Sequence, residues 1–173
     1  PHGAGVRTRI TDDLLWLPYV LAEYLEVTGD WSVCGEKTCY LESPPLREGE
    51  RERYETPRCS EREDTVYRHA LAAIRCAMER GAGSHGLALI GGGDWNDGMN
   101  RVGAGGRGES VWLTWFLALV LRKFAPVCRH MEEPQLAEEL LGRAEGYRKA
   151  AEAAWDGSWY RRGYFDSGAP LGT

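Results

Sequence analysis

Two carboxylates, an amide and an indole stand together directly after a run of glycines. Residues 91–100 read Gly-Gly-Gly-Asp-Trp-Asn-Asp-Gly-Met-Asn, and the polar and aromatic side chains are Asp94, Trp95, Asn96 and Asp97. Glycine adopts backbone conformations closed to other residues, so a glycine-rich loop can aim its neighbours at a ligand. Carboxylates and amides hydrogen-bond hydroxyl groups and an indole offers a flat apolar face, which together suit the binding and cleavage of a sugar. The alternative is an ordinary solvent-exposed loop, because Gly, Asn and Asp are also frequent in turns.

Metal and nucleotide interpretations of this segment fail on spacing. An EF-hand calcium loop that begins at Asp94 needs an oxygen ligand at its fifth position and Glu at its twelfth, where the chain has Gly98 and Gly105. The glycine run also lacks the Gly-Lys-Ser/Thr ending of a phosphate-binding P-loop. The histidines lie far apart without metal-ligand spacing and are expected to be surface or core residues; they are His2, His69, His85 and His130. We therefore predict no metal site and no cofactor.

The composition is that of an ordinary globular domain. The chain has 173 residues, 43% hydrophobic and 27% charged, with a net charge of −5. Arginines are scattered among acidic residues, which argues against a nucleic-acid partner. The longest strongly apolar stretch, residues 111–121, is far shorter than the roughly 20 residues that cross a bilayer, so no direct membrane contact is expected. Five cysteines without a Cys-x-x-Cys pair predict neither a disulfide framework nor a zinc cluster, and they favour a reducing compartment.

Four segments carry the apolar spacing of amphipathic helices, at residues 14–28, 65–80, 110–124 and 134–154. Pro18 is acceptable only near a first turn, so the first helix either begins there or bends there. The third is apolar nearly all round and is expected to be an inner helix, whereas the fourth has one charged face and is expected to be an outer helix. Inner helices shielded by outer ones favour a helical barrel or toroid.

Long irregular connections separate these helices. Residues 30–64 and 81–109 exceed the two to eight residues usual between bundled helices, and such long loops are usually functional. The charged run at 48–55 is expected to be solvated, and the aromatic tail at 159–165 is expected to start a hairpin.

Several stretches, taken together, carry a family resemblance. They are residues 5–18 (GVRTRITDDLLWLP), 24–30 (YLEVTGD), 92–103 (GGDWNDGMNRVG) and 106–112 (GRGESVW). They resemble the catalytic domain of glycoside hydrolase family 94, a family of inverting phosphorylases that act on β-linked glucosides. Within the family, the sequences at 44–46 (PPL) and 101–103 (RVG) are most similar to those of the carboxy-terminal domain of cyclic β-1,2-glucan synthases and of β-1,2-oligoglucan phosphorylases.

The resemblance implies an all-α fold with minor β-structure, in which six helical hairpins form an (α/α)6 barrel with the site at one mouth. Four helices cannot close such a barrel. Residues 1–173 are therefore expected to be a single fragment of an (α/α)6-barrel catalytic domain, about two helical hairpins with long active-site loops, incomplete at both ends. The expected setting is cytoplasmic, either as a free-standing enzyme or as the cytoplasmic part of an inner-membrane synthase, with a homodimer as one expected assembly.

The resemblance also assigns chemical roles. Asp97 falls on the family's general acid, and Trp95 falls on the tryptophan that contacts the sugar in the cleaved subsite. The acid protonates the glycosidic oxygen while inorganic phosphate, a co-substrate that needs no activating base, attacks the anomeric carbon from the opposite face. The implied partners are a β-glucan or oligosaccharide and phosphate, and the implied product is α-glucose 1-phosphate. Two alternatives stay open, a non-catalytic glucan-binding or scaffold relative and an inverting glycoside hydrolase.

The family's sugar-binding Arg and Asp, six residues apart, fall on Arg7 and Asp13, which are expected to hold sugar hydroxyls by charge-assisted hydrogen bonds. Arg9 and Asp12 share this neighbourhood and remain alternatives. Asp12 and Asp13 could instead only cap the following helix. A general acid must be protonated at neutral pH, and Asp94 and the incoming phosphate are candidate sources of the negative charge that favours protonation. The family's phosphate-binding His and Thr-Gly lie outside this chain, so the fragment alone is expected to be inactive.

Overall fold

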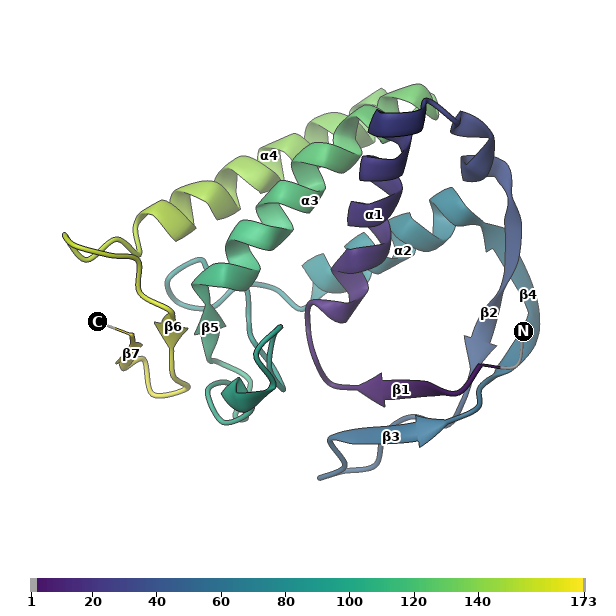
Figure 1. The fold of residues 1–173 in the computed structure, drawn as a ribbon. Helices are drawn as coiled ribbons and strands as arrows, with labels where there is room; N and C mark the ends of the chain where they lie inside the picture. The colour runs from purple at the N-terminus through teal and green to yellow at the C-terminus, as the bar shows by residue number, and fades with distance from the viewer. Residues whose placement is uncertain (1–2, 173) are drawn as a thin grey trace.

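The structure is a computed structural model that describes residues 3–172. Its four helices lie side by side or crossed, and the loops and short strands gather at their ends (Figure 1). The helices are α1 (Asp13–Thr28), α2 (Val66–Glu79), α3 (Val111–His130) and α4 (Pro134–Glu152). All four predicted helices are confirmed, and so is the helical character of the fold with minor β-structure. The partial (α/α)6 barrel stays a prediction.

Helices α3 and α4 form an antiparallel hairpin that supplies much of the core (Figure 1). Helix α3 buries residues on most of its circumference, whereas α4 buries one stripe, as the sequence predicts for an inner and an outer helix. Helix α1 packs against α2 and α3, and the rings of Tyr67 and Phe124 stack with their centroids 5.8 Å apart where α2 meets α3. The apolar stripes of four helices therefore converge on one core.

Helix α3 is longer than predicted. It runs through Pro126 to His130, and Val127 and Cys128 in its added turns are fully packed in the core. With 20 residues and a mean hydropathy of 1.5 in its most apolar window, α3 is long and apolar enough to cross a membrane, so the length expected from residues 111–121 alone was too short. Because 67% of its most apolar window is buried inside the protein, we interpret α3 as a core helix.

Helix α1 begins before its proline. Asp13 is its first residue, Pro18 lies inside it, and Gly29 ends it in a left-handed conformation (φ 67°) with its N–H donated to the Leu25 carbonyl. One face of α1 stays exposed and apolar, formed by Trp16, Leu17, Val20, Tyr24 and Val27. If the chain is part of an (α/α)6 barrel, as predicted, other helices of that barrel would cover this face.

Three of the strands lie in the connection 30–64 that the sequence presents as irregular, and one of them pairs with a strand before α1. Strand β1 (Gly5–Thr8) pairs with β3 (Glu52–Glu55), and β2 (Lys37–Glu42) pairs with β4 (Arg58–Thr65). Residues 48–55 are exposed or half-buried, as the sequence predicts for a solvated charged run, but residues 52–55 also form the strand β3. Strands β3 and β4 consist mostly of charged and polar residues, which hides them from a search for hydrophobic periodicity. The predicted hairpin in the aromatic tail is confirmed as β6 (Gly163–Tyr164) and β7 (Pro170–Leu171), which extend β5 (Glu109–Ser110).

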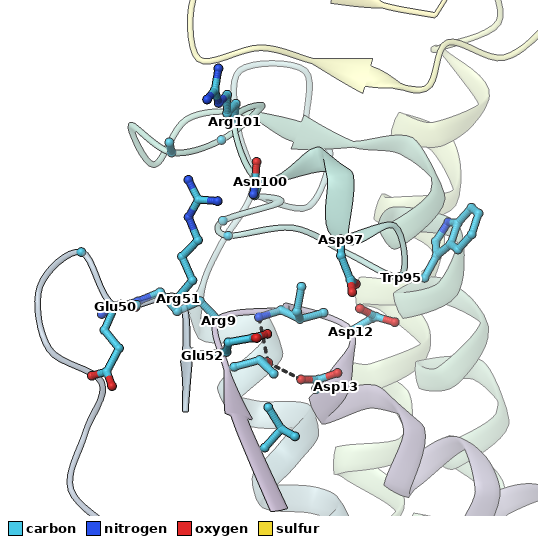
Figure 2. Close-up of a pocket in the computed structure, with 18 of the residues that line it drawn as sticks. Arg9, Asp12, Asp13, Glu50, Arg51, Glu52, Trp95, Asp97, Asn100 and Arg101 are labelled. Atoms are coloured by element: carbon cyan, nitrogen blue, oxygen red, sulfur yellow. Dashed lines mark hydrogen bonds between the residues drawn. The ribbon is translucent and has the colours of Figure 1, made fainter. Parts of the chain in front are cut away.

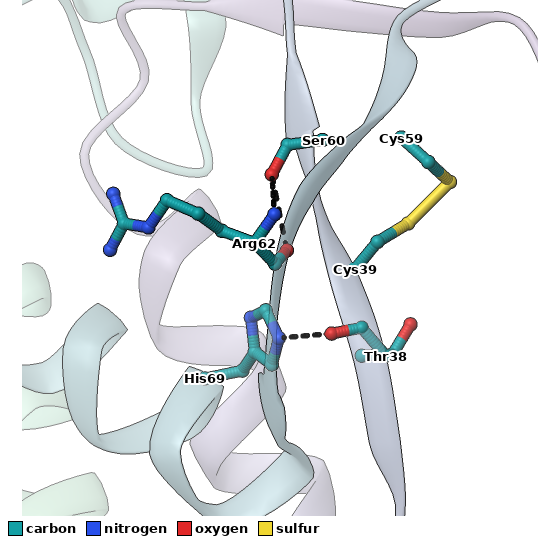
Figure 3. The surroundings of a disulfide bond; sticks show 6 residues. All are labelled: Thr38, Cys39, Cys59, Ser60, Arg62 and His69. Carbon is teal, nitrogen blue, oxygen red and sulfur yellow. Dashed lines mark hydrogen bonds between the residues drawn. A yellow bond between two sulfur atoms is a disulfide. The ribbon is translucent and has the colours of Figure 1, made fainter.

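A disulfide bond joins Cys39 on β2 to Cys59 on β4 (Figure 3). The prediction of no disulfide is corrected here, because antiparallel pairing brings the two Cα atoms to 5.5 Å although twenty residues separate them in sequence. The remaining cysteines are free; they are Cys34, Cys76 and Cys128. The bond closes the base of an excursion, residues 43–57, that carries β3.

The histidines make separate contacts. His69 hydrogen-bonds the Thr38 carbonyl, and His130 stacks on Trp31 with the ring centroids 3.7 Å apart. His2 lies outside the described residues. Within residues 3–172, no group of three or more His, Cys, Asp or Glu side chains is placed to hold a metal ion.

Candidate active site

The glycine run lies against the junction between β1 and α1. The Thr11 N–H and hydroxyl both donate to the Gly93 carbonyl, at 3.0 and 2.8 Å. A Cβ on Gly92 would lie only 2.8 Å from the Arg9 Cβ, and Gly93 has a φ of 139° that other residues rarely adopt. Glycine is therefore required at these two positions for the backbone to approach this closely.

A cavity of about 1280 Å³ opens at this junction. Its walls come from the β1–α1 junction, from the excursion between β2 and β4 and from the loop 91–106 (Figure 2). The charged, amide and aromatic side chains that line it are Arg9, Asp12, Asp13, Trp16, Glu48, Glu50, Arg51, Glu52, Tyr54, Trp95, Asp97, Asn100 and Arg101. Polar and aromatic groups in an open cavity of this size suit a carbohydrate ligand.

Asp97 lines the cavity at the first position of the short helix η2 (Asp97–Met99). Its carboxylate makes no hydrogen bond or ion pair with any other residue in 3–172, and Figure 2 shows it pointing toward Asp12. Trp95 also lines the cavity and is 56% exposed, with its ring centroid 6.0 Å from that of Trp112 on α3. The structure thus brings the predicted acid and the predicted sugar-stacking residue to one cavity, both free to meet a ligand.

Asp94 has different surroundings although it is only three residues from Asp97. It is fully buried, and Arg162 donates to both of its carboxylate oxygens at 2.6 and 2.8 Å. The Ser110 hydroxyl donates to it at 2.6 Å. Asp94 does not line the cavity, because its carboxylate is turned inward to these partners. The prediction that Asp94 contacts substrate therefore receives no support from its position.

Asn96 organises the loop between these two residues. Its side-chain oxygen accepts the Gly98 N–H at 3.1 Å and caps η2, while its own N–H donates to Asp94 at 3.2 Å. Asn96 is not among the residues that line the cavity. Its position supports a role in orienting Asp97 and not the predicted contact with substrate.

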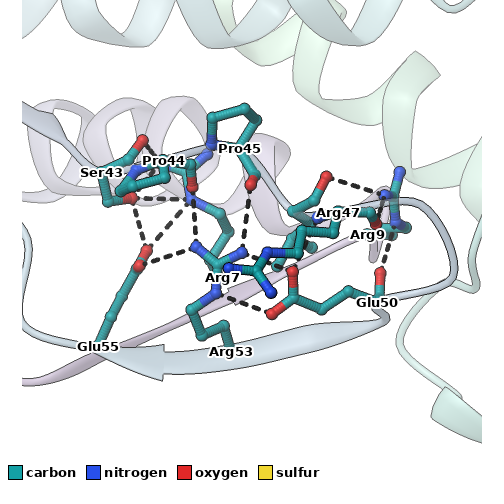
Figure 4. Close-up of polar contacts among 10 residues, drawn as sticks. Arg7, Arg9, Ser43, Pro44, Pro45, Arg47, Glu50, Arg53 and Glu55 are labelled. Atoms are coloured by element: carbon teal, nitrogen blue, oxygen red, sulfur yellow. Dashed lines mark hydrogen bonds and ion pairs between the residues drawn. The ribbon is translucent and has the colours of Figure 1, made fainter.

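Arg7 and Asp13 line two adjacent cavities that share Thr8 and Arg9 on their walls, and their predicted joint grip on a sugar stays a prediction. Arg7 on β1 donates to the Ser43 hydroxyl and to Glu55, with its Nε 3.2 Å from Glu55 Oε1 (Figure 4). It borders a smaller neighbouring cavity of about 500 Å³. Asp13 lines the large cavity and accepts a hydrogen bond from the Thr8 hydroxyl. Of the predicted pair, only Asp13 lines the cavity that Asp97 lines.

The excursion between β2 and β4 is held by arginines. Arg53 donates to Glu50 at 2.5 Å, and this hydrogen bond lowers the pKa of Glu50 to about 2. The Ser43 hydroxyl and then Arg7 lower the pKa of Glu55. Arg9 donates to backbone carbonyls of the excursion, at 2.8 Å to both Arg47 and Glu50 (Figure 4). This network fixes the charged wall of the cavity, which sequence reasoning missed.

The far end of the glycine loop is held by Asp166. Its carboxylate accepts backbone N–H groups from Gly105, Arg107 and Gly108 at 2.7–2.9 Å. Burial raises the pKa of Asp166, but these bonds outweigh it and hold the pKa below its usual value. Together with Arg162, Asp166 shows that the tail after α4 braces the loop that carries Asp97. No local signal in the sequence connects these distant segments.

The chain belongs to the glycoside hydrolase 94 family. Its sequence matches the "Glycosyl hydrolase 94 superfamily, catalytic domain" over residues 2–173. The matched range spans every segment that builds the cavity.

Named relatives agree with this assignment. The chain is 44% identical over 171 residues to a cyclic beta-(1,2)-glucan synthase NdvB of Rhizobium meliloti (strain 1021), covering 98% of this chain and 6% of that protein. It is 34% identical to a solabiose phosphorylase of Paenibacillus borealis and 35% identical to a cellobionic acid phosphorylase of Neurospora crassa, covering 94% of this chain in both cases and 19% and 18% of those proteins. The chain therefore spans less than a fifth of the length of each of these relatives.

Proposed function

We propose that the protein containing this chain is an inverting glycoside phosphorylase that cleaves a β-glucosidic bond, in a β-1,2-glucan, with inorganic phosphate. The observation that carries the proposal is the Asp97 carboxylate, which enters a cavity lined by Trp95 without any partner among residues 3–172. The neighbouring Asp94 carboxylate is instead paired with Arg162 and holds the fold together, so it is not available to a ligand as the Asp97 carboxylate is. The names of the relatives, two phosphorylases and a β-1,2-glucan synthase, support this chemistry and this linkage.

In the proposed reaction, the Asp97 carboxyl group donates its proton to the glycosidic oxygen as the bond to the anomeric carbon breaks. An oxygen of phosphate forms the new bond to that carbon from the opposite face, which inverts the β-configuration and yields α-glucose 1-phosphate. The shortened glucan leaves with the proton on its new hydroxyl, and Asp97 is left as a carboxylate. Trp95 would stack on the sugar in the cleaved subsite.

The residues that hold phosphate are expected outside this chain, so the proposal concerns the full-length protein and expects the fragment alone to be inactive. No cofactor is required besides phosphate as co-substrate. The expected cytoplasmic location and the homodimer stay predictions.

The test is phosphate dependence. The full-length protein is incubated with a β-1,2-glucan with and without inorganic phosphate, and α-glucose 1-phosphate and free glucose are measured separately. Release of α-glucose 1-phosphate only with phosphate supports the proposal. Phosphate-independent release of glucose would identify an inverting hydrolase, for which the other carboxylates of the cavity offer a candidate base. Binding of the glucan without either product would identify a non-catalytic relative.

A further inference from the structure

The ladder between β2 and β4 is interrupted at its disulfide bond. On the side that continues into α2, Cys39 pairs with Glu63. On the side of the excursion, Leu41 pairs with Cys59, and regular pairing is lost in between, across residues 60–62 of β4. The bond between Cys39 and Cys59 spans this interruption (Figure 3). It therefore ties together two parts of the ladder that regular strand pairing does not join.

Little regular pairing lies on the outer side of the interruption. After Leu41 and Cys59, the last pair of the ladder is Glu42 with Arg58. These two side chains also form an ion pair, but 50% and 84% of their surface is exposed, and such surface pairs contribute little stability. The disulfide bond is thus the strongest link at the outer end of this stem.

The strand pair β1–β3 depends on the stem for its position. The two strands pair with each other, and no extensive contact between either strand and a helix is found within residues 3–172. Figure 1 shows the pair lying below the helices. Besides the stem, the chain connects the pair to the helices through residues 9–12, which lead from β1 into α1. A looser stem therefore lets the strand pair move relative to the helices.

This mobile unit would be one wall of the large cavity. The excursion contributes charged and aromatic side chains to it, namely Glu48, Glu50, Arg51, Glu52 and Tyr54. The loop 91–106 forms another part of the wall, and Arg162 and Asp166 anchor it to the tail after α4 (Figure 2). No hydrogen bond within residues 3–172 joins this loop to the excursion. Movement of the excursion therefore changes the width of the cavity but leaves the anchors of the loop that carries Asp97 intact.

The disulfide bond lies at the surface. Cys59 is exposed and Cys39 is half-buried, whereas the free thiols of Cys34 and Cys128 are buried in the core. Thiol–disulfide exchange requires that a thiol from solution reach a sulfur atom of the bond. The bonded pair is therefore placed where a reductant can act without unfolding the core.

We propose that the bond between Cys39 and Cys59 is a redox switch that controls glucan binding through the position of the excursion. The inference rests on the proposed function in that it takes the ligand of the cavity to be a β-glucan. With the bond closed, the excursion is held in its binding position. With the bond open, the excursion moves, and the glucan binds only the fraction of molecules whose wall is in place.

The redox step is an exchange between thiols and disulfides. A dithiol gives two electrons and two protons to the protein, so that the S–S bond breaks, both cysteines become thiols and the dithiol closes to a cyclic disulfide. Oxidised glutathione reverses the step, since it takes up two electrons and two protons and leaves as two glutathione thiols.

The test compares the full-length protein treated with oxidised glutathione and with dithiothreitol. Alkylation and peptide mass mapping establish whether Cys39 and Cys59 are linked in the first sample and free in the second. Reduction should raise the KM for a β-1,2-glucan about fivefold, the increase expected if the loosened wall is in place about one-fifth of the time. The kcat should not change, and hydrogen exchange should become faster at residues 43–57 but not at 91–110.

Substitutions separate this bond from any other thiol of the full-length protein. Cys39→Ser combined with Cys59→Ser should show the raised KM after either treatment. Cys76→Ser, which removes the exposed thiol on α2, is the matched control and should respond to dithiothreitol as the wild type does. Reduced wild type shows the effect of opening the bond without any substitution, so the inference does not depend on the folding of the double variant.

Absence of a link between Cys39 and Cys59 after treatment with oxidised glutathione overturns the inference. Equal affinity for the glucan in the oxidised and reduced samples overturns it as well, and so does a redox response that persists in the double variant. Affinity is also measured without phosphate, by titration calorimetry. If reduction weakens glucan binding there but no α-glucose 1-phosphate forms when phosphate is added, the proposed function fails while the switch stands.

Discussion

The two halves of the glycine-rich loop carry the same side chain in opposite environments. In the first half, Asp94 is buried and bound by Arg162 and Ser110 from segments distant in sequence. In the second half, Asp97 stands in an open cavity without a partner in the described chain. An aspartate that holds the fold and an aspartate left free for a ligand are thus three residues apart. The difference shows that the motif joins a structural carboxylate, Asp94, to a carboxyl group that is available to a ligand, Asp97. Substitutions at four positions test this division of roles.

Substitution of Asp97, in the second half of the loop, should have the largest effect on activity. Asp97→Asn removes the proton donor and should lower phosphate-dependent release of α-glucose 1-phosphate by the full-length protein about a thousandfold. Its melting temperature should not change, because the carboxylate makes no bond within the described chain. Asp64→Asn, outside the cavity, is the control and should retain full activity. A melting temperature lowered by several degrees in Asp97→Asn would contradict the division.

The anchored half should respond in stability. Arg162→Ala leaves the Asp94 carboxylate buried without its cation and should destabilise the protein by about 3 kcal/mol. Thermal unfolding of the full-length protein checks this, with hydrogen exchange at residues 91–110 to locate the loss. Adding Asp94→Ala should recover part of the stability, because the unpaired charge is then gone. Unchanged stability with lost activity would instead make Asp94 a functional residue.

Trp95 should affect binding more than folding. It is 56% exposed, so Trp95→Ala should leave the melting temperature unchanged while raising the KM for the glucan about tenfold, about 1.4 kcal/mol. Trp95→Phe keeps an aromatic face and should lose less. Trp159→Ala removes an exposed indole outside the cavity and should not change KM. An effect of Trp95→Ala on kcat alone would argue against stacking in the bound ground state.

The smallest effect is expected at the link between the halves. Asn96→Ala removes one neutral hydrogen bond, which the Gly98 N–H donates to the Asn96 side chain. Its loss should destabilise the short helix η2 by about 1 kcal/mol. We expect kcat to fall about threefold with KM unchanged, because Asp97 is positioned less well but the cavity is intact. Asn96→Asp preserves the accepting oxygen and should behave like wild type. Equal losses in the two variants would exclude this orienting role.

Sequence reasoning found the parts of the fold whose cause is local. The spacing of apolar residues predicts each of the helices α1, α2, α3 and α4, and Gly29 predicts the end of the first. It failed at the end of α3, because burial of Val127 and Cys128 by the rest of the core keeps the helix going past Pro126. It also failed at β3, where charged side chains are ordered by Arg7 and Arg53 rather than by apolar packing.

The site was predictable to the extent that its residues are adjacent in sequence. Asp97 and Trp95 could be singled out because a glycine run presents them, and both reach the cavity. The inward turn of Asp94 could not be predicted, since its partner Arg162 lies 68 residues further along the chain. The separation of Arg7 from Asp13 likewise depends on Ser43 and Glu55, which only the pairing of β1 with β3 brings near.

The bond between Cys39 and Cys59 has a consequence for how this scaffold can diversify. The excursion that forms one wall of the cavity is connected to the rest of the chain through β2 and β4, and the disulfide bond joins these two strands. Extra residues on the far side of that bond add little entropic penalty and do not displace α1 or α2. Variation at Glu48 and Arg51, which line the cavity outside β3, can therefore reshape what the cavity admits while β3 stays paired with β1 and the acid and its anchor keep their places.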